Sequence, residues 1–472
     1  MNAWVYAHRL ELILFVAALM VRLFLISIAP AQEVQTYWIG FDGDGYVNEA
    51  VNILAGHGFS QAYAPPYIPD TLKTPLYPLA LAGVHLLFGS YIPILIFEAF
   101  LSSLIPIFAV RMAQFFIRRR SVLYTLGFFL VFEPHLMFST IFFGTEGISV
   151  VLIAWGLYEV LAMIYKPKPY LHTGLAAVAF GLATLARPIT YYLPVFFILL
   201  FAYQGYVVKR MREFTLAFVV FIAIFGLVLS PWIMRNFVVF GTPTMSTASW
   251  FNVYTRLAAS VQAIDTGDDF YTSYHKLLDN LSLQGYIKHP PPVAEGEIEG
   301  PEFAPILRRE SLRIMEQHPR ALVIYLATVP FSVLTQSNLL GYVSSFVPLH
   351  YDHPSFSPTA YASHYGVVAL IKAISPYLLG PYIVPYIVRT LLVILAVLAC
   401  AGAWILWRKG DRFAALFLFG FITYLIVFTS SAGAQITDRH RAPFLAAEAV
   451  LAAVALERFI DKRQGKRSTL AS

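Results

Sequence analysis

The chain has 472 residues, of which 58% are hydrophobic and only 13% are charged. Soluble globular domains carry about 25% charged residues, so this composition excludes an ordinary soluble enzyme and indicates a protein embedded in a membrane. Lys and Arg outnumber Asp and Glu, 33 against 27, which in membrane proteins marks cytoplasmic loops rather than nucleic-acid binding. The single cysteine, Cys400, excludes a disulfide framework, and no Cys/His cluster indicates structural zinc.

Apolar runs of spanning length follow one another along the chain. The first, from Leu10 to Pro30, is too long for the core of a signal peptide and contains Arg22, so we predict an uncleaved first helix. Arg22 either reaches the membrane surface or faces the protein interior, where it could bind an anion. The expected spans lie near 10–29, 91–117, 121–141, 145–165, 170–187, 188–207, 213–232, 321–340, 379–407, 413–431 and 441–458.

Basic clusters between these runs predict the orientation of the chain. Examples are Arg118-Arg119-Arg120, Lys209-Arg210 and the tail 459–472, which the positive-inside rule assigns to the cytoplasm. Both termini then lie inside, and the number of crossings is even. Either the apolar patch 364–378 also crosses, giving about twelve spans, or one run is re-entrant, giving about ten.

The polar segments concentrate on the opposite, extracytoplasmic side. One covers 30–90 and the other, the most polar part of the chain, covers 233–320. Within the second, the Pro/Gly/Glu-rich stretch 289–303 reads as loop, and 303–317 is expected to form an amphipathic surface helix. The apolar piece 75–88 lies in the membrane interface or extends the second helix. The fold class is therefore an all-α, polytopic helical bundle with external loops that carry short amphipathic helices.

The stretch FDGDGYVNEAVNILAGHGFS at 41–60 predicts a short external helix. Apolar residues from Tyr46 to Leu54 fall on one helical face. Asp42 or Asp44 would cap the helix, and Gly56 and Gly58 would end it. A cap and a solvated turn residue are a sufficient structural explanation for either aspartate alone.

Further motifs occur in a fixed order along the chain. They are PPYIPDTLKTPLYPLALAGVHLLFG at 65–89, EPHLMFSTIFFGTEGISVVL at 133–152, GLATLARPITYYLP at 181–194, SPWIMRNFVVFGTPTMSTASWFNVY at 230–254 and ITDRHRAPFLAAEAVLAA at 436–453. Together these resemble the integral-membrane GT-C glycosyltransferases, in particular bacterial relatives of the dolichyl-phosphate-mannose protein mannosyltransferases and of the lipid A aminoarabinose transferase. The resemblance spans about residues 10–455, so 1–458 is expected to form one transmembrane glycosyltransferase domain.

The resemblance implies transfer of a sugar from a polyprenyl-phosphate carrier to an acceptor hydroxyl on the extracytoplasmic side of the plasma (inner) membrane, with inversion. The chemistry needs a carboxylate to take the acceptor proton and cations to stabilise the departing phosphate. Asp42, four residues before Tyr46, is the first candidate for the base and Asp44 the second. The motif DGDG departs from the Asp-Glu pair of relatives, which leaves the choice between the two aspartates open.

Candidate phosphate-binding cations lie at the outer ends of the predicted helices. The cluster Arg439-His440-Arg441 is the first choice, because paired guanidiniums can hold a phosphate. Here His440 replaces the tyrosine usual in relatives. Arg187, Arg235 and Lys73 are further candidates, with helix anchoring or solvation as their structural alternative.

Glu146 lies where relatives carry an acid, and it is either a site residue or part of a Thr145-Glu146 helix cap. The resemblance also allows a divalent metal near the donor phosphate, although no ligand spacing identifies one. The expected partners are a polyprenyl-phosphate sugar donor, an acceptor and membrane lipids, with no nucleic acid.

Two other readings of the same features remain. The chain could be a ligase or polymerase of lipid-linked glycans of the O-antigen-ligase type, or a transporter or flippase of such lipids. A transporter is less well supported, because no internal repeat is visible and the polar residues concentrate in external loops rather than at the middle of the membrane.

Overall fold

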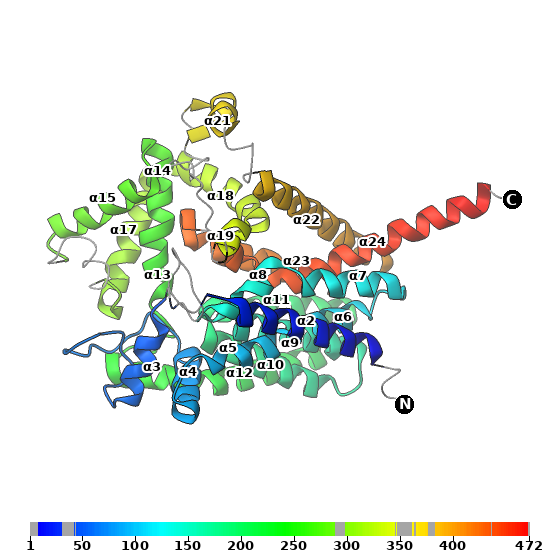
Figure 1. The fold of residues 1–472 in the computed structure, drawn as a ribbon, viewed down its shortest axis with the longest axis horizontal. Helices are drawn as coiled ribbons and strands as arrows, with labels where there is room; N and C mark the ends of the chain where they lie inside the picture. Colours follow the sequence, from blue (N-terminus) through cyan, green and yellow to red (C-terminus); the bar gives the residue numbers. More distant parts are fainter. Residues whose placement is uncertain are drawn as a thin grey trace.

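A computed structural model describes residues 8–30, 42, 44–287, 298–344, 346, 361–362, 365–375, 383–435 and 437–470. These residues form a helical bundle with a smaller group of helices at one end (Figure 1). No strand occurs in the described ranges, which confirms the all-α prediction. The predicted loop 289–303 falls largely outside the described residues.

Eight helices in the described ranges are long and apolar enough to cross a membrane, and a ninth is obtained if one bent pair counts as a single span. The chain is thus an integral, multi-pass membrane protein. The eight are α2 (Arg9–Ile28), α5 with α6 (Pro93–Ser102 and Ile105–Ala113), α9 (Glu146–Tyr165), α10 (Pro169–Ala186), η2 with α11 (Pro188–Thr190 and Leu193–Val207), α12 (Met211–Phe240), α22 (Ile383–Lys409) and α23 (Arg412–Thr429) continued by η7 (Ser430–Gln435).

The remaining predicted runs are helical as well. The bent pair is α7 (Arg120–Val131) followed by α8 (Pro134–Phe138) and η1 (Ser139–Ile141), with an angle of 51° between its two parts. The last two runs correspond to α18 (Pro319–Thr335) and to the start of α24 (Ala442–Leu470), which continues through the predicted basic tail. Helices α2 and α24 have their outer ends at the same end of the bundle (Figure 1), as expected for an even number of crossings.

In the patch at 364–378 the structure describes residues 365–375, whose helix is the short α21 (Val367–Ile374). Eight residues rise about 12 Å, far less than the ~30 Å hydrocarbon core of a bilayer, so this helix cannot cross. The piece at 75–88 is a separate helix, α4 (Leu76–Phe88), which ends at the left-handed residue Gly89 and does not extend the next span.

Helix α9 lies at the centre of the bundle, with 83% of its spanning window buried. It is apolar around its whole circumference, the pattern of a helix enclosed by neighbours, and it packs against α10, α6, α24 and α5. Helix α12, by contrast, is mostly lipid-facing, with 28% of its window buried. Its 30 residues rise about 45 Å, so its last turns emerge from the bilayer. There Arg235 contacts the loop before α4 and Asn236 contacts the loop after α12.

The helices at the other end are α3 (Tyr46–Leu54), α13 (Ala248–Asn252), the π-helical turn η3 (Val253–Ala258), α14 (Ala259–Thr266), α15 (Phe270–Leu283) and α17 (Ala304–Gln317). We call them, with α4, the helical cap. Helix α17 is the predicted amphipathic helix. Its apolar residues Leu307 and Ile314 pack with Phe251 and Tyr254 in a small hydrophobic core of the cap.

Candidate functional site

Asp42 caps helix α3, as one of the sequence readings expected. One carboxylate oxygen accepts the N–H of Tyr46 at 2.9 Å and the other accepts the N–H of Val47 at 2.7 Å. Gly45, between the aspartates and the helix, has φ +73°, a backbone conformation that glycine adopts without strain. Burial raises the pKa of Asp42 above its usual value, while the two N–H donors and Lys73 oppose that rise.

Asp44 lies in a network of ion pairs that joins four distant parts of the chain. Its carboxylate is 3.0 Å from Nη2 of Arg439. The Nε of Arg439 donates to Glu146 at 2.9 Å, and Arg187 donates to the same Glu146 oxygen at 3.0 Å. We call Asp44, Glu146, Arg187 and Arg439 the ionic cluster. It contains two carboxylates and two guanidiniums, so its formal charge is balanced.

Glu146 is the first residue of α9 and the shared acceptor of this cluster. A carboxylate at a helix N-terminus is stabilised by the helix dipole. Thr145 makes no capping hydrogen bond, and the contacts of Glu146 with other parts of the chain are its ion pairs with Arg187 and Arg439. Arg187 follows α10 and Arg439 lies in the turn η8 (Asp438–His440), so two helix junctions meet at one acidic side chain.

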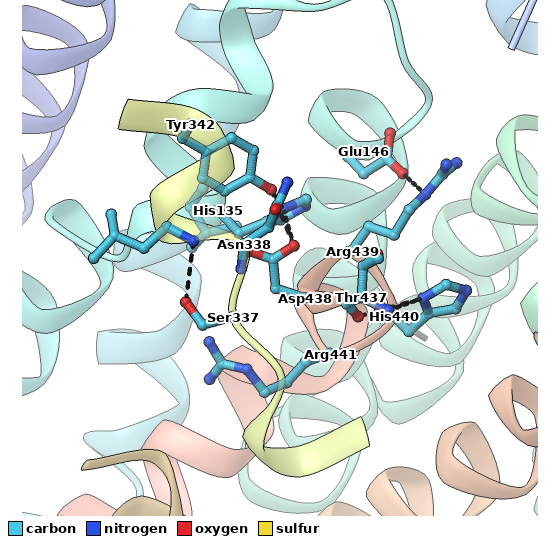
Figure 2. A network of polar contacts seen from close by, with 12 residues as sticks. His135, Glu146, Ser337, Asn338, Tyr342, Thr437, Asp438, Arg439, His440 and Arg441 are labelled. Carbon is cyan, nitrogen blue, oxygen red and sulfur yellow. Dashed lines mark hydrogen bonds and ion pairs between the residues drawn. The ribbon is translucent and has the colours of Figure 1, made fainter. Parts of the chain in front are cut away.

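Arg441 is two residues from Arg439 but points away from it (Figure 2). It is almost fully buried, and its Nη2 lies 2.6 Å from Glu133, which is equally buried. A second carboxylate, Glu448, lies 3.7 Å from Nη1. Glu133 also accepts the N–H of Leu136 and so caps α8. A clamp in which Arg439 and Arg441 hold one phosphate would require Arg441 to leave this buried pair.

Arg22 is completely buried and faces the protein interior. Its Nε donates to Ser102 at 2.9 Å and its Nη1 donates to the carbonyl of Ala18. Of the two expectations for this residue, the structure shows the interior one.

Asp438 is a buried acid that the sequence reading did not single out. Its carboxylate accepts the hydroxyl of Tyr342 at 3.0 Å and the N–H of Asn338 at 3.1 Å, and it lies 3.5 Å from His135 (Figure 2). Burial would raise the pKa of Asp438, but His135 and these hydrogen bonds outweigh burial and hold the pKa below its usual value. The turn that carries Arg439 is thus fixed to α8 and to α19 (Leu339–Ser344).

His440 faces the arginines of the ionic cluster. Its Nδ1 accepts the N–H of Thr437 at 3.1 Å. Burial, followed by the charges of Arg187 and Arg439, lowers the pKa of His440 to about 3, so its imidazole is neutral at physiological pH. It therefore adds no charge to a phosphate site.

Lys73 lies close to the base candidates. Its ammonium is 5.0 Å from the centre of the Tyr46 ring and 2.7 Å from Oε1 of Gln61. The Tyr46 ring also meets Tyr77 edge-on, with the ring centres 5.1 Å apart. Lys73 and Tyr46 thus lie on the Asp42 side of the site.

Arg235 has a different environment. It donates to the carbonyl of Asp70 and to the side chain of Asn236, each at 2.8 Å, and its guanidinium lies 4.8 Å from the centre of the Trp232 ring. These contacts fasten the loop before α4 to the emerging end of α12. Of the predicted cations, the structure therefore brings Arg187 and Arg439 together and gives Arg235 and Arg441 other partners.

Glu49 is a second buried acid near this loop. Its side chain is fully buried, and burial together with Asp70 raises the pKa of Glu49 to about 10. A neutral, protonated carboxyl is the form that burial favours. Only its place on the inner face of α3 could have pointed to it in the sequence.

Metal binding has little support from the donor groups present. In the described part of the chain, no group of three or more His, Cys, Asp and Glu side chains is arranged to hold a metal ion. The carboxylates of the ionic cluster are engaged with guanidiniums. These residues therefore do not form a fitting metal site.

Comparisons with known proteins support the architecture. No family model and no curated protein sequence matches the chain. Solved structures of the archaeal oligosaccharyltransferase AglB from Archaeoglobus fulgidus do match. One holds an inhibitory peptide and a dolichol-phosphate, with a TM-score of 0.52 and 12% identity over 99% of this chain and 52% of that one. Another is tethered to an acceptor peptide, with a TM-score of 0.52 and 13% identity over 99% of this chain and 51% of that one.

A structure of ArnT from Cupriavidus metallidurans bound to undecaprenyl phosphate also matches, with a TM-score of 0.39 and 15% identity over 95% of this chain and 78% of that one. The chain spans about half the length of the matched oligosaccharyltransferase chains. At this level of identity the likeness to the oligosaccharyltransferase structures concerns the fold alone. The chain thus shares the polytopic helical fold of the membrane region of the matched archaeal oligosaccharyltransferase structures.

Proposed function

We propose that the protein transfers a sugar from a polyprenyl-phosphate donor to an acceptor hydroxyl at the extracytoplasmic membrane surface. The observation that carries this proposal is the ionic cluster, which places two guanidiniums and two carboxylates at the cap end of a GT-C bundle. The dolichol-phosphate bound by the matched oligosaccharyltransferase supports a lipid phosphate as the ligand. The basic residues Arg118–Arg120 and the C-terminal end of α24 lie at the opposite end, since Arg119 pairs with Asp461, and this supports an extracytoplasmic cap.

The balanced charge of the cluster predicts how the donor binds. With Asp44 and Glu146 in place, Arg439 and Arg187 are neutralised, and an added phosphate would bring unpaired negative charge. Glu146 is nearly buried while Asp44 is 37% exposed, so Asp44 is the partner that can leave. The donor phosphate therefore takes the place of Asp44 on Arg439, and the guanidiniums then stabilise the charge that grows on the departing phosphate.

Asp42 is the proposed general base. Its oxygens are oriented by the N–H groups of Tyr46 and Val47, and each oxygen retains a further lone pair for a proton. Burial raises the pKa of its carboxyl, which makes it a stronger proton acceptor than a solvated aspartate. Attack by the activated hydroxyl on the face opposite the phosphate would form the new glycosidic bond, break the sugar–phosphate bond and invert the anomeric centre.

The test measures binding of undecaprenyl phosphate to the protein in nanodiscs. Arg439→Ala should weaken binding, because a charge-assisted contact is lost. Asp44→Asn should strengthen binding, because the lipid no longer displaces a carboxylate. The matched control is Arg320→Ala, which removes an exposed arginine at the start of α18. If Arg439→Ala and Arg320→Ala have equal effects, the phosphate does not bind at the cluster.

Turnover separates the two aspartates. With a polyprenyl-phosphate sugar as donor, Asp42→Asn should reduce transfer to a small residual rate while leaving lipid binding unchanged. Asp44→Asn should change lipid affinity more than the rate at saturating donor. A transporter without a base at Asp42 would tolerate Asp42→Asn.

A further inference from the structure

A small cavity lies between the turn after α10 and the loop after α12. Its volume is about 280 Å³, slightly below the usual range for ligand pockets, about 300–1,000 Å³. A cavity of this size suits a single small ring rather than a lipid chain. We call it the hydroxyl pocket, and it is lined by Pro188, Tyr191, Tyr192, Thr242, Pro243, Thr244, Met245, Ser246 and Ser249.

Hydrogen bonds to the neighbouring helices hold both walls of the pocket in place. On the α12 side, Trp232 donates to the carbonyl of Met245 at 3.0 Å and Asn236 donates to the carbonyl of Thr244 at 2.8 Å. On the other side, the hydroxyl of Tyr424 donates to the carbonyl of Ile189 at 2.7 Å. Since Arg235 in turn donates to Asn236, this arginine supports the pocket wall.

Two chain connections place the pocket next to the ionic cluster. Pro188, in one wall, directly follows Arg187. From the other wall, Ser246 donates to the carbonyl of Leu72 at 2.5 Å, and Leu72 directly precedes Lys73. One wall of the pocket is therefore continuous in sequence with Arg187, and the other is hydrogen-bonded to the residue that precedes Lys73.

The lining has the chemistry of a carbohydrate site. It contains no charged side chain, so a phosphate would find no counter-charge there. Within the described chain, the hydroxyls of Tyr191, Tyr192, Thr242 and Ser249 make no hydrogen bond to the protein. Tyr192 also offers a ring that is 44% exposed and is supported from behind by Phe428, with the ring centres 5.2 Å apart.

A pyranose presents both an apolar face of C–H groups and a rim of hydroxyls. An exposed tyrosine ring can cover the apolar face, and free hydroxyls can donate to or accept from the rim. We propose that the hydroxyl pocket binds one sugar ring, with Tyr192 against its face. The role of such a pocket rests on the proposed glycosyl transfer, in which the bound ring belongs either to the donor or to the acceptor.

A direct binding measurement tests the pocket without requiring turnover. The protein in nanodiscs is mixed with methyl α-mannopyranoside or methyl β-glucopyranoside, and saturation-transfer NMR detects contact with the ring protons. The wild type should give a signal with at least one probe, and Tyr192→Ala should weaken that binding roughly tenfold. Tyr192→Phe should retain most of it, because the ring remains. The control Tyr206→Ala removes a tyrosine that is 78% exposed near the C-terminal end of α11, the helix that Tyr192 precedes, and should have no effect.

Absence of a signal in the wild type, or an equal signal in Tyr192→Ala, would overturn the proposal that the hydroxyl pocket binds a sugar ring. If the pocket binds a sugar ring, the affinity of the protein for lipid phosphates shows whether that ring belongs to the donor or to the acceptor. If Tyr192→Ala weakens binding of mannosyl-phospho-undecaprenol but not of bare undecaprenyl phosphate, the ring is the donor's. If neither affinity changes while the methyl glycoside signal is lost, the ring is the acceptor's. Failure of the proposed function would instead appear as lipid binding that Arg439→Ala does not affect.

Discussion

Replacing Arg441 by methionine tests the buried ion pair beneath the site. Arg441 and Glu133 are 2.6 Å apart and each is only 3% exposed, and Glu448 is 1% exposed. Removing the cation leaves two carboxylates facing each other out of reach of water. Loss of one partner of a buried ion pair costs about 3–5 kcal/mol, so the free energy of unfolding should fall by about that amount.

A second substitution shows that charge is responsible. In Arg441→Met/Glu133→Gln one of the two facing carboxylates is gone and only Glu448 is left without its cation, so the repulsion between them is removed. The glutamine oxygen can still accept the N–H of Leu136 that caps α8. Replacing a buried ion pair by neutral groups is often close to neutral in stability, so the double variant should be more stable than Arg441→Met. Coupling between contacting residues is typically about 0.5–3 kcal/mol.

The assay is equilibrium unfolding in mixed micelles, followed by circular dichroism. Arg320→Met, at an exposed position, controls for the substitution itself and should change stability by less than about 0.5 kcal/mol. A cost below about 1 kcal/mol for Arg441→Met would contradict the reasoning, as would a double variant that is less stable than the single one.

The remaining predictions concern catalysis and the backbone. With Asp42 as base, the transfer rate should fall as the pH decreases through a pKa above the usual value of aspartate, because a protonated carboxyl cannot take the proton of the acceptor hydroxyl. A pH–rate profile measures this fall. If the same fall at low pH persists in the residual activity of Asp42→Asn, Asp42 is not the base. The pKa of His440 is lowered to about 3, so His440→Gln should leave the acid limb above pH 5 in place. Gly433→Ala should destabilise the protein by about 1–3 kcal/mol, because Gly433 has φ +60° and an added Cβ would lie 2.3 Å from the carbonyl oxygen of Arg256. A melting temperature equal to that of the wild type would contradict the predicted loss of stability. Asp44→Asn should still turn over donor, which a radiolabelled-sugar transfer assay can measure, and complete loss of transfer would point to Asp44 as the base.

Much of the helical architecture could be predicted from the apolar runs. A span must satisfy its own backbone hydrogen bonds in lipid, so a long apolar segment has few alternatives to a helix. The capping of the N-terminus of α3 by an aspartate was also predictable, because an aspartate before an amphipathic segment is a local signal. The length of α12 was not predictable. Its predicted run ended at Trp232, whereas the helix continues through Arg235 and Asn236, whose partners are carbonyls in the loops before α4 and after α12.

The candidate site could be predicted only in part. The motifs drew attention to Asp44, Glu146, Arg187 and Arg439, but their pairing depends on tertiary structure, with Arg439 293 positions from Glu146 and 395 from Asp44. Spacing could not reveal that Arg439 and Arg441 have different partners. In a tight turn, residues two positions apart face different neighbours, and only the folded bundle shows which of them contain carboxylates.

The role of Asp438 could not be predicted from the sequence either. It lies inside a motif that the sequence reading singled out, yet its neighbours there are arginines and a histidine, which drew attention to phosphate binding. Its partners His135 and Tyr342 come from other helices. A buried acid is recognised by what surrounds it, and sequence alone does not give those surroundings.

The most direct test of the account is a structure of the protein with undecaprenyl phosphate bound, determined by electron microscopy in nanodiscs. The account predicts that the phosphate lies within hydrogen-bonding distance of the Arg439 guanidinium and that the Asp44 carboxylate has moved away, while Glu146 keeps its contact with Arg187. A phosphate bound elsewhere, with the Asp44–Arg439 pair still closed at about its present 3.0 Å, would contradict it.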